Sequence, residues 1–359
     1  MNIIEGIGGL VASMNKKNNE NNTHISRPVA NTLSKSAKSS MLTRIISAIV
    51  IVLVMVPSIF LGDWIYFGLI TILLGIACWE ILGCTRKRTF IVFLIYFMFV
   101  ACIAYWPLFK TVAVNGTTLD RIDNYFNGIY LSILIIAIGV FLMFSLTVLY
   151  KDFTVQDATF LITMGILIGL GFQCLFYLRF IPNSVFGLTN LKSWVYTFDN
   201  TVKTSLLLLF VFLATVLTDV GAYFVGVFFG KHKMNERVSP KKTWEGFFGG
   251  IVISFLLSSS IALIFAACGY PILPMFDIQH FYYILILSFL IPLFATLGDF
   301  VFSSIKRFWG IKDYGKLIPG HGGVLDRLDS VFFAAIISAV IVFMFLSIEN
   351  GFDWAKFLV

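Results

Sequence analysis

The chain has 359 residues, of which 58% are hydrophobic and only 13% are charged. A soluble globular domain carries about 25% charged residues, so this composition excludes an ordinary water-soluble protein and indicates a membrane protein. The formal net charge is +7, which orientation in the membrane and anionic ligands explain better than nucleic-acid binding does.

The first 44 residues differ from the rest of the chain. They contain an Asn/Lys tract from Asn15 to Asn22 and many Ser and Thr residues, so we expect a mostly disordered, basic cytoplasmic tail over 1–44. Lys16 and Lys17 follow the weakly apolar stretch Ile3 to Met14 instead of preceding it, which is the reverse of a secretory signal. We therefore expect no cleavage.

Nine apolar stretches follow the tail. A helix needs roughly 20 residues to cross a hydrocarbon core of about 30 Å, and backbone groups in lipid must pair within their own segment. The predicted helices are Ile45 to Leu61, Trp64 to Cys84, Thr89 to Phe109, Ile129 to Tyr150, Ala158 to Phe180, Thr204 to Gly226, Phe247 to Cys268, Phe281 to Leu297 and Val331 to Ile348. The sequence thus predicts an all-α, polytopic membrane protein.

The positions of Lys and Arg test this helix count. With a cytoplasmic amino terminus, 20 of the 26 Lys and Arg residues fall in cytoplasmic segments and 6 in outer segments. A miscount by one helix would place the clusters Arg86 to Arg88 and Lys231 to Lys242 on opposite faces. We therefore expect helices one to five with an outer loop over 45–203, and four catalytic helices with cytoplasmic loops over 204–359.

The first polar feature is Asp219, within T-D-V-G-A-Y in the sixth predicted helix. It lies roughly 10 Å from the inner end of that helix. An ionisable group at such depth costs about 2.5 to 3.5 kcal/mol and normally faces a cavity or a partner. Tyr223, four residues further on, shares its face. The alternative is a buried Asp that is bonded to a neighbouring hydroxyl.

The second feature is the basic loop Lys231 to Glu245, which ends where the seventh predicted helix begins. Lys241 and Lys242 are strong donors for phosphate oxygens, and Thr243 with Glu245 is a helix-start pattern. A loop that merely follows the positive-inside rule is the alternative.

The third feature follows the eighth apolar stretch. Asp299, Ser303, Lys306 and Arg307 lie on one broad stripe if the segment is helical, because spacings of three, four and seven return to the same side. An ordinary surface ion pair is the alternative.

The fourth feature, P-G-H-G-G-V-L-D-R-L-D, runs from Pro319 to Asp329 into the ninth predicted helix. Glycines let the backbone approach a ligand closely, and successive amides in such a turn can cradle phosphate. Asp326 and Asp329, three residues apart at a helix start, can bind one divalent cation. A plain helix start explains one Asp by capping, but not two Asp that flank an Arg.

These four features converge on the inner leaflet under the predicted topology. Carboxylates with many Lys and Arg residues, without a Walker loop, fit metal-assisted phosphoryl or nucleotidyl transfer. The remaining intramembrane acid, Glu80, is either a residue that lines the site or the acceptor of a structural hydrogen bond.

At these residues the chain resembles the phosphatidate cytidylyltransferases, also called CDP-diacylglycerol synthases. The pattern S-x-x-K-R, K-D and P-x-H-G-G-x-x-D-R-x-D is matched at Ser303, Lys306, Arg307, Lys312, Asp313, Pro319, His321, Gly322, Gly323, Asp326, Arg327 and Asp329. The upstream D-x-x-A-Y at Asp219, S-P-K-K-T-W-E-G at Ser239 and G-D at Gly298 also look like the family. Members often carry Glu where this chain has Phe302.

The resemblance implies that CTP and phosphatidic acid react to CDP-diacylglycerol and diphosphate at the cytoplasmic surface of a bacterial plasma membrane. It implies a Mg²⁺ requirement, leaves a second, monovalent cation open, and suggests a homodimer. It implies catalytic roles for Asp219, Asp299, Lys306, Asp326 and Asp329, the four aspartates also binding metal. It implies substrate contacts for Lys231, Ser239, Lys241, Lys242, Arg307, Lys312, His321, Gly322, Gly323 and Arg327. His321 either bonds a phosphate oxygen or braces its loop.

Three other functions stay open from the sequence. A secondary transporter of an anionic solute would also use buried acids and basic loops, although the polar residues cluster at one surface and no inverted repeat is visible. A CTP-dependent lipid kinase and a polyprenyl-phosphate transferase are nearer alternatives. Labelled CTP distinguishes them, because only nucleotidyl transfer leaves the nucleotide in lipid.

Overall fold

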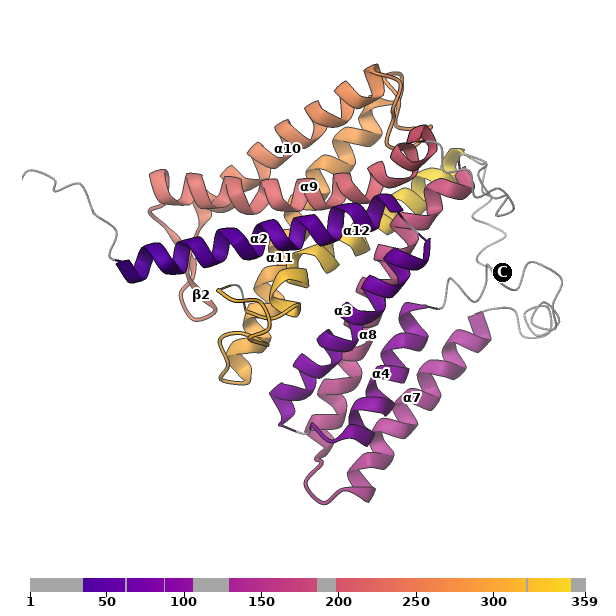
Figure 1. Ribbon diagram of the computed structural model, residues 1–359, viewed down its shortest axis with the longest axis vertical. Helices are drawn as coiled ribbons and strands as arrows, with labels where there is room; N and C mark the ends of the chain where they lie inside the picture. The colour runs from indigo at the N-terminus through magenta and orange to yellow at the C-terminus, as the bar shows by residue number, and fades with distance from the viewer. Residues whose placement is uncertain are drawn as a thin grey trace, which may run out of the picture. The chain divides into compact units, whose positions relative to one another are not determined.

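The computed structural model describes residues 35–61, 63–86, 88–105, 129–185, 198–320 and 322–349 (Figure 1). The chain separates into two units, Met1–Ile45 and Ile46–Val359. Of the first unit, only the start of one helix lies within the described residues. The second unit contains everything that positions the polar features.

Apolar helices dominate the described part of the chain. They are α2 (Lys35–Leu61), α3 (Asp63–Thr85), α4 (Phe90–Ala104), α7 (Ile129–Leu149), α8 (Val155–Val185), α9 (Phe198–Phe229), α10 (Trp244–Ala267), α11 (Phe281–Phe308) and α12 (Leu325–Glu349). Among these, α3, α8, α9, α10, α11 and α12 are long and apolar enough to cross a membrane, whereas α2, α4 and α7 offer shorter apolar stretches. The prediction of an all-α, polytopic membrane protein is confirmed.

Several helices are longer than the apolar stretches that predicted them. Helix α11 continues past Leu297 to Phe308, and α12 begins at Leu325, six residues before Val331. The polar stripe after Gly298 and the acids of the D-R-L-D motif are therefore helical. Their side chains project at fixed helical spacings instead of from loops.

The basic loop between α9 and α10 forms a β-hairpin, which the sequence pattern did not predict. Strands β1 (Lys233–Asn235) and β2 (Ser239–Thr243) pair antiparallel. At the turn, the side-chain oxygen of Asn235 accepts hydrogen bonds from the amides of Arg237 and Val238, the local bonding that favours Asn in turns. The predicted helix start is confirmed, because the Thr243 hydroxyl caps α10 by accepting from the Gly246 amide at 3.2 Å.

Small residues let the helices of the second half approach closely. A Cβ added at Gly250 of α10 would lie 2.9 Å from both Ala222 Cβ and the Thr218 carbonyl oxygen of α9. In the same interface, Ser254 donates to the Ala214 carbonyl at 2.8 Å. Contacts of this kind hold membrane helices together where lipid removes the hydrophobic driving force.

Helix α8 contacts helices of both the amino-terminal half (α3, α4 and α7) and the carboxy-terminal half (α9 and α12) of the chain. The first three pack on one side of it and the other two on the other side, as the ribbon shows (Figure 1). At Gly171 the backbone of α8 leaves room for the ring of Phe332 on α12, which stacks edge-on against Phe172. The start of α12 is thus anchored on a helix of the amino-terminal half.

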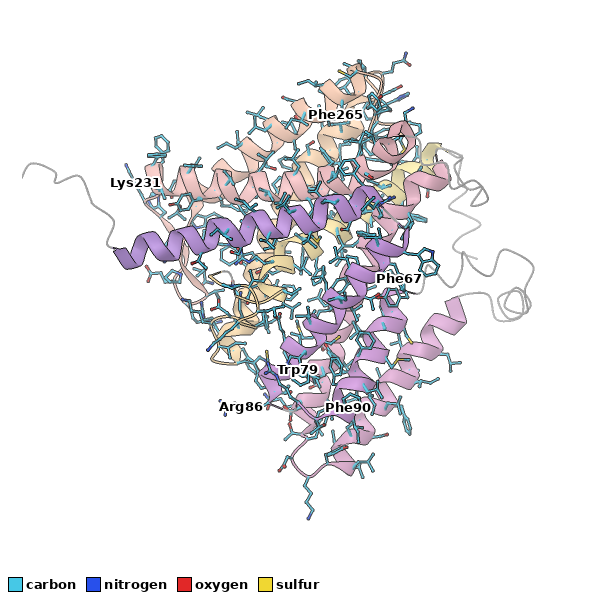
Figure 2. The ribbon with its side chains drawn as sticks, viewed as in Figure 1. Phe67, Trp79, Arg86, Phe90, Lys231 and Phe265 are labelled. Atoms are coloured by element: carbon cyan, nitrogen blue, oxygen red, sulfur yellow. The ribbon has the colours of Figure 1, made fainter. Side chains whose placement is uncertain are left out.

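Aromatic and basic side chains gather where α3 ends and α4 begins. Trp79, Arg86 and Phe90 are close to one another at this end of the bundle, and Phe67 lies toward the other end of α3 (Figure 2). The guanidinium of Arg88 lies 5.3 Å from the centre of the Trp79 ring, a cation–π contact.

Candidate active site

A polar cavity of about 210 Å³ lies where α9, α11 and α12 meet. It is lined by Asp219, Asp299, Lys306, Asp313, Asp326, Arg327, Asp329 and Ser330. All four aspartates that the sequence singled out contribute to it, together with Lys306 and Arg327. Residues up to 111 positions apart in the chain, from Asp219 to Ser330, thus share one cavity.

Helix α11 comes very close to α12 beside this cavity. A Cβ at Gly298 would lie 2.6 Å from the carbonyl oxygen of Asp329 and 2.9 Å from Phe333, so only glycine fits there without separating the helices. The close approach places Asp299, the next residue, on the same cavity as Asp329. This explains in physical terms why Gly precedes Asp at this point of the chain.

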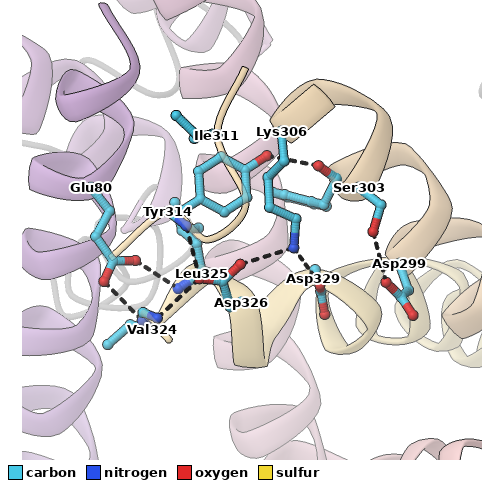
Figure 3. A network of polar contacts seen from close by, with 12 residues as sticks. Glu80, Asp299, Ser303, Lys306, Ile311, Tyr314, Val324, Leu325, Asp326 and Asp329 are labelled. Carbon is cyan, nitrogen blue, oxygen red and sulfur yellow. Dashed lines mark hydrogen bonds and ion pairs between the residues drawn. The ribbon is translucent and has the colours of Figure 1, made fainter. Parts of the chain in front are cut away.

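Lys306 joins the two helices within the site. Its ammonium lies 2.9 Å from Oδ1 of Asp326 and 3.9 Å from Oδ2 of Asp329 (Figure 3), and 5.4 Å from the centre of the Tyr314 ring. All three charged residues are buried. A buried carboxylate pair needs such a cation, because isolated buried charges are very unfavourable.

Asp326 braces the loop that leads into α12. Its Oδ2 accepts the amides of Tyr314 and Gly323, both at 2.9 Å, while Oδ1 accepts from Lys306. Both carboxylate oxygens therefore have protein donors, and Figure 3 shows this network. The amide of Gly322 donates to the Ile318 carbonyl at 3.1 Å, so the predicted phosphate-cradling amides of Gly322 and Gly323 are engaged within the loop.

Asp219 is in the opposite situation. Within the described ranges it makes no hydrogen bond or salt bridge, and its exposed side chain lines the cavity. The alternative prediction, a bond to a neighbouring hydroxyl, is not what the structure shows. Asp299 accepts a 3.2 Å hydrogen bond from Ser303 and forms a 2.5 Å salt bridge with Lys242 of the hairpin.

The hairpin is fixed to the site by two basic residues. Lys242 reaches Asp299 and also lies 4.3 Å from the centre of the Phe300 ring. Arg307 donates from Nε to the Val238 carbonyl at 3.4 Å and from a terminal nitrogen to the Ile311 carbonyl at 3.1 Å. The predicted convergence of hairpin and α11 is therefore present, with Arg307 engaged in backbone contacts.

Other predicted substrate residues lie outside the cavity lining. Lys231, Lys241 and Lys312 are exposed, and Ser239 is half-buried on β2. His321 lies outside the described residues. Its loop bends through Gly320 and Gly322, which have φ values of 76° and 86°, where a side chain would be strained.

The structure adds residues that the sequence argument did not select for the site. Asp313 and Ser330 line the cavity; Asp313 belongs to the K-D pair of the motif, whereas Ser330 carried no signal. Tyr314 is buried and donates its hydroxyl to the Phe302 carbonyl at 3.1 Å. Burial raises the pKa of the Tyr314 hydroxyl, so it remains a neutral donor.

Phe302, where members of the resembled family often have Glu, is not among the residues that line the cavity. The residue is completely buried and packs against the rings of Tyr314 and Phe332, with centroids 6.0 and 6.2 Å away. A carboxylate at this position of this chain would enter an apolar core. The departure therefore removes no cavity-lining group.

The donor set of the cavity is made of oxygen ligands. Carboxylates are the ligands that Mg²⁺ and other hard cations prefer, and Asp219 has both oxygens free of protein donors in the part of the chain that is described. No cluster of three or more His, Cys, Asp or Glu within the described ranges is already arranged as a metal site. The donor chemistry of the cavity fits Mg²⁺.

Comparison with known proteins places these features in a family. The chain is 35% identical to a phosphatidate cytidylyltransferase of Staphylococcus epidermidis over 196 residues, which is 54% of this chain and 62% of the relative. It is 36% identical to that of Bacillus subtilis over 199 residues, with the same coverage. It is 44% identical to that of Mycobacterium leprae over 126 residues, 35% of this chain and 37% of the relative.

The matched segments span less than two thirds of the length of these relatives. A family match covers much more of the chain, since the sequence model of the Cytidylyltransferase family matches residues 42–345. This range includes α9, α11, most of α12 and every residue that lines the cavity. The chain therefore belongs to the Cytidylyltransferase family.

Proposed function

We propose that this protein is a phosphatidate cytidylyltransferase, which converts CTP and phosphatidic acid to CDP-diacylglycerol and diphosphate in phospholipid biosynthesis. The observation that carries the proposal is the cavity in which carboxylates from three membrane helices meet Lys306 and Arg327. The named relatives support the choice of substrates, because each is a phosphatidate cytidylyltransferase.

The reaction is a substitution at the α-phosphorus of CTP. A phosphate oxygen of phosphatidic acid forms the new P–O bond, and the bond to the β-phosphate oxygen breaks, so that diphosphate leaves with the electron pair. A phosphomonoester has its second pKa near 6 and is mainly a dianion at neutral pH. It therefore needs no strong general base, and the main obstacle is repulsion between two anions.

The residues of the cavity are suited to reduce that repulsion. We assign cation binding to Asp219, Asp299 and Asp329. To Asp326 we assign the role of holding the loop that leads into α12 in position. A Mg²⁺ ion held by the first three of these residues would supply positive charge that offsets the repulsion between the phosphates. Lys242 and Arg327 lie at the same site, and preorganised cations of this kind stabilise charge that develops on a leaving group.

Exposed basic residues of the hairpin and of the loop between α11 and α12 add to the positive charge of Lys242 and Arg327. Lys231, Lys241 and Lys312 are placed to attract the triphosphate from water, because exposed cations raise the local concentration of an anionic substrate. Ser239 and the loop around His321 complete the proposed nucleotide contacts. Gly322 and Gly323 contribute through the shape of the loop.

We also propose the finer features of topology and assembly. The nine apolar helices of the described residues cross or enter the membrane, with the amino terminus and the cavity on the cytoplasmic side, as the distribution of Lys and Arg favours. The tail 1–44, in which α2 already begins at Lys35, precedes five helices in 45–203 and the catalytic part 204–359. The protein works in a bacterial plasma membrane as a homodimer.

The test is synthesis by the purified protein in lipid vesicles. Cytidine-labelled CTP, phosphatidic acid and Mg²⁺ are expected to give labelled lipid together with one equivalent of diphosphate. Phosphorylated lipid without cytidine would instead identify a kinase, and uptake of an anionic solute without lipid labelling would identify a carrier. Either outcome would overturn the proposal.

A further inference from the structure

The buried carboxylate of Glu80 lies on α3, far in sequence from the cavity, and contacts the start of α12. Its Oε1 accepts the amide of Val324 and its Oε2 accepts the amide of Leu325, both at 2.9 Å. The residue is only 3% exposed. Figure 3 shows the carboxylate reaching across from a separate helix. A long-range contact of this kind fixes the position of α12 relative to the amino-terminal helices.

The contact supplies hydrogen-bond acceptors to backbone amides at the start of α12. The first amides of an α-helix have no partner within the helix, and a negative charge there is favourable. Val324 precedes the first residue of α12, and its carbonyl accepts from the amides of Arg327 and Leu328. Glu80 therefore caps α12 from outside the local sequence, in the place where a Ser or Asp of the chain itself usually acts.

The same carboxylate also lies against two glycines of the loop between α11 and α12, one in its middle and one near its end. A Cβ built at Gly315 or at Gly323 would clash with Glu80. Gly323 is in turn bonded to Asp326, which also holds the amide of Tyr314. Two carboxylates thus hold one loop, Glu80 from the side of α3 and Asp326 from within α12.

The contacts continue directly to the cavity. Leu325, bonded to Glu80, is followed by Asp326, which forms the salt bridge with Lys306. Asp329 lies one helical turn further along α12. A shift at the start of α12 would displace both acids together, because a helix moves as a rigid element.

We infer that Glu80 is a positioning residue for the reaction, which sets the place of the acids of α12 without touching the substrate. The inference rests on the proposed function for its catalytic readout. Removal of groups that orient metal ligands typically lowers activity or metal affinity by about 10- to 100-fold. A residue of the amino-terminal half would then contribute to catalysis by holding the acids of α12 in position.

The decisive variant is Glu80→Gln, which keeps the size of the side chain but turns one acceptor into a donor that faces an amide. We expect the turnover of folded, monodisperse protein to fall by about 10- to 100-fold and the Mg²⁺ concentration for half-maximal rate to rise. A variant that is merely less folded would lose turnover with an unchanged Mg²⁺ dependence. Unchanged turnover and unchanged Mg²⁺ dependence would overturn the inference.

Two further variants make the test specific. Gly315→Ala keeps the glutamate but puts a methyl group where its carboxylate lies, so the carboxylate must shift. The variant is expected to show the same rise in the Mg²⁺ requirement. Asp157→Asn is the matched control, since Asp157 is also buried and holds the Thr154 amide at 3.0 Å at the start of α8. We expect Asp157→Asn to leave the Mg²⁺ dependence unchanged.

Hydrogen exchange separates this inference from the proposed function. In Glu80→Gln, the amides of Val324 and Leu325 are expected to exchange faster than in the unmodified protein, while amides in α10 are unaffected. If the unmodified protein makes no CDP-diacylglycerol, the proposed function fails, and this measurement alone decides whether Glu80 holds the loop. Equal exchange in both proteins would overturn the inference even if synthesis is confirmed.

Discussion

The ammonium of Lys306 on α11 lies 2.9 Å from Oδ1 of Asp326 on α12, and both residues are buried. This pair connects the two helices that come closest beside the cavity. The four aspartates of the cavity differ in whether protein groups bind their carboxylate oxygens. Asp326 is held by protein donors on both oxygens, whereas Asp219 faces the cavity without a protein partner in the described ranges.

The first prediction concerns Lys306. Replacing it by Met leaves Asp326 and Asp329 buried without their cation, and breaking a buried pair in this way typically costs about 3 to 5 kcal/mol. We expect a lower midpoint of thermal unfolding in detergent and no measurable synthesis. Lys312→Met, an exposed lysine of the following loop, is the control and should unfold like the unmodified protein. Equal stability of both variants would contradict the bracing role.

The second prediction contrasts two acids. Asp219→Asn removes a charge that no described protein group neutralises by contact, so stability should be unchanged or higher while activity falls by about 10²- to 10³-fold. Asp326→Asn also removes an acceptor of backbone amides and should cost about 1 to 3 kcal/mol in addition. Thermal unfolding and initial rates on the same samples check both. Equal destabilisation by the two substitutions would refute this difference between the two acids.

The third prediction concerns the contact of α11 with α12. In Gly298→Ala the new methyl group must push the Asp329 backbone away, and overpacking of this kind costs about 1 to 3 kcal/mol. We expect lower stability together with loss of synthesis. The matched control is Gly68→Ala in α3, where nothing lies within 4 Å of the added Cβ. It should gain about 0.5 to 1 kcal/mol from the higher helix propensity of Ala.

The fourth prediction concerns Lys242. Its partner Asp299 lines the cavity, and the lysine is placed at the edge of the proposed nucleotide site. Lys242→Ala should raise KM for CTP more than KM for phosphatidic acid, because a triphosphate loses a cationic contact. Steady-state rates at varied concentration of each substrate measure this. An unchanged KM for CTP would show that Lys242 serves the hairpin alone.

The fifth prediction concerns the cation. Removal of Mg²⁺ with a chelator should abolish synthesis, and adding Mg²⁺ back should restore it. Bound Mg²⁺ should also raise the midpoint of thermal unfolding of the unmodified protein, since a ligand stabilises the state that binds it. Asp219→Asn should show a smaller rise. Full activity in the presence of chelator would remove the role we assign to the aspartates.

Much of the site could be predicted from the sequence because its residues sit at helical spacings. Asp299, Lys306, Asp326 and Asp329 were expected to converge, and the cavity contains all four. The expected helix starts were confirmed for α10, where the Thr243 hydroxyl makes a local contact. Local patterns of this kind need no knowledge of the tertiary structure.

The remainder depended on contacts that no local pattern reveals. The hairpin escaped prediction because its strands are short, charged and interrupted by Pro240, with no apolar alternation. The bracing role of Asp326 depends on the backbone of Tyr314, which the loop brings back to it. The partner of Glu80 lies 244 residues away, so its environment could not be read from spacing.

The hairpin is held both at its base and beside its turn. The Glu245 carboxylate accepts the amides of Lys231 and His232, and Arg307 holds the Val238 carbonyl. Its tip at Glu236 is exposed and lies outside these contacts. A fluorophore attached to a cysteine introduced at that tip would act as a reporter of nucleotide arrival, recording displacement of the strands without disturbing the anchor points.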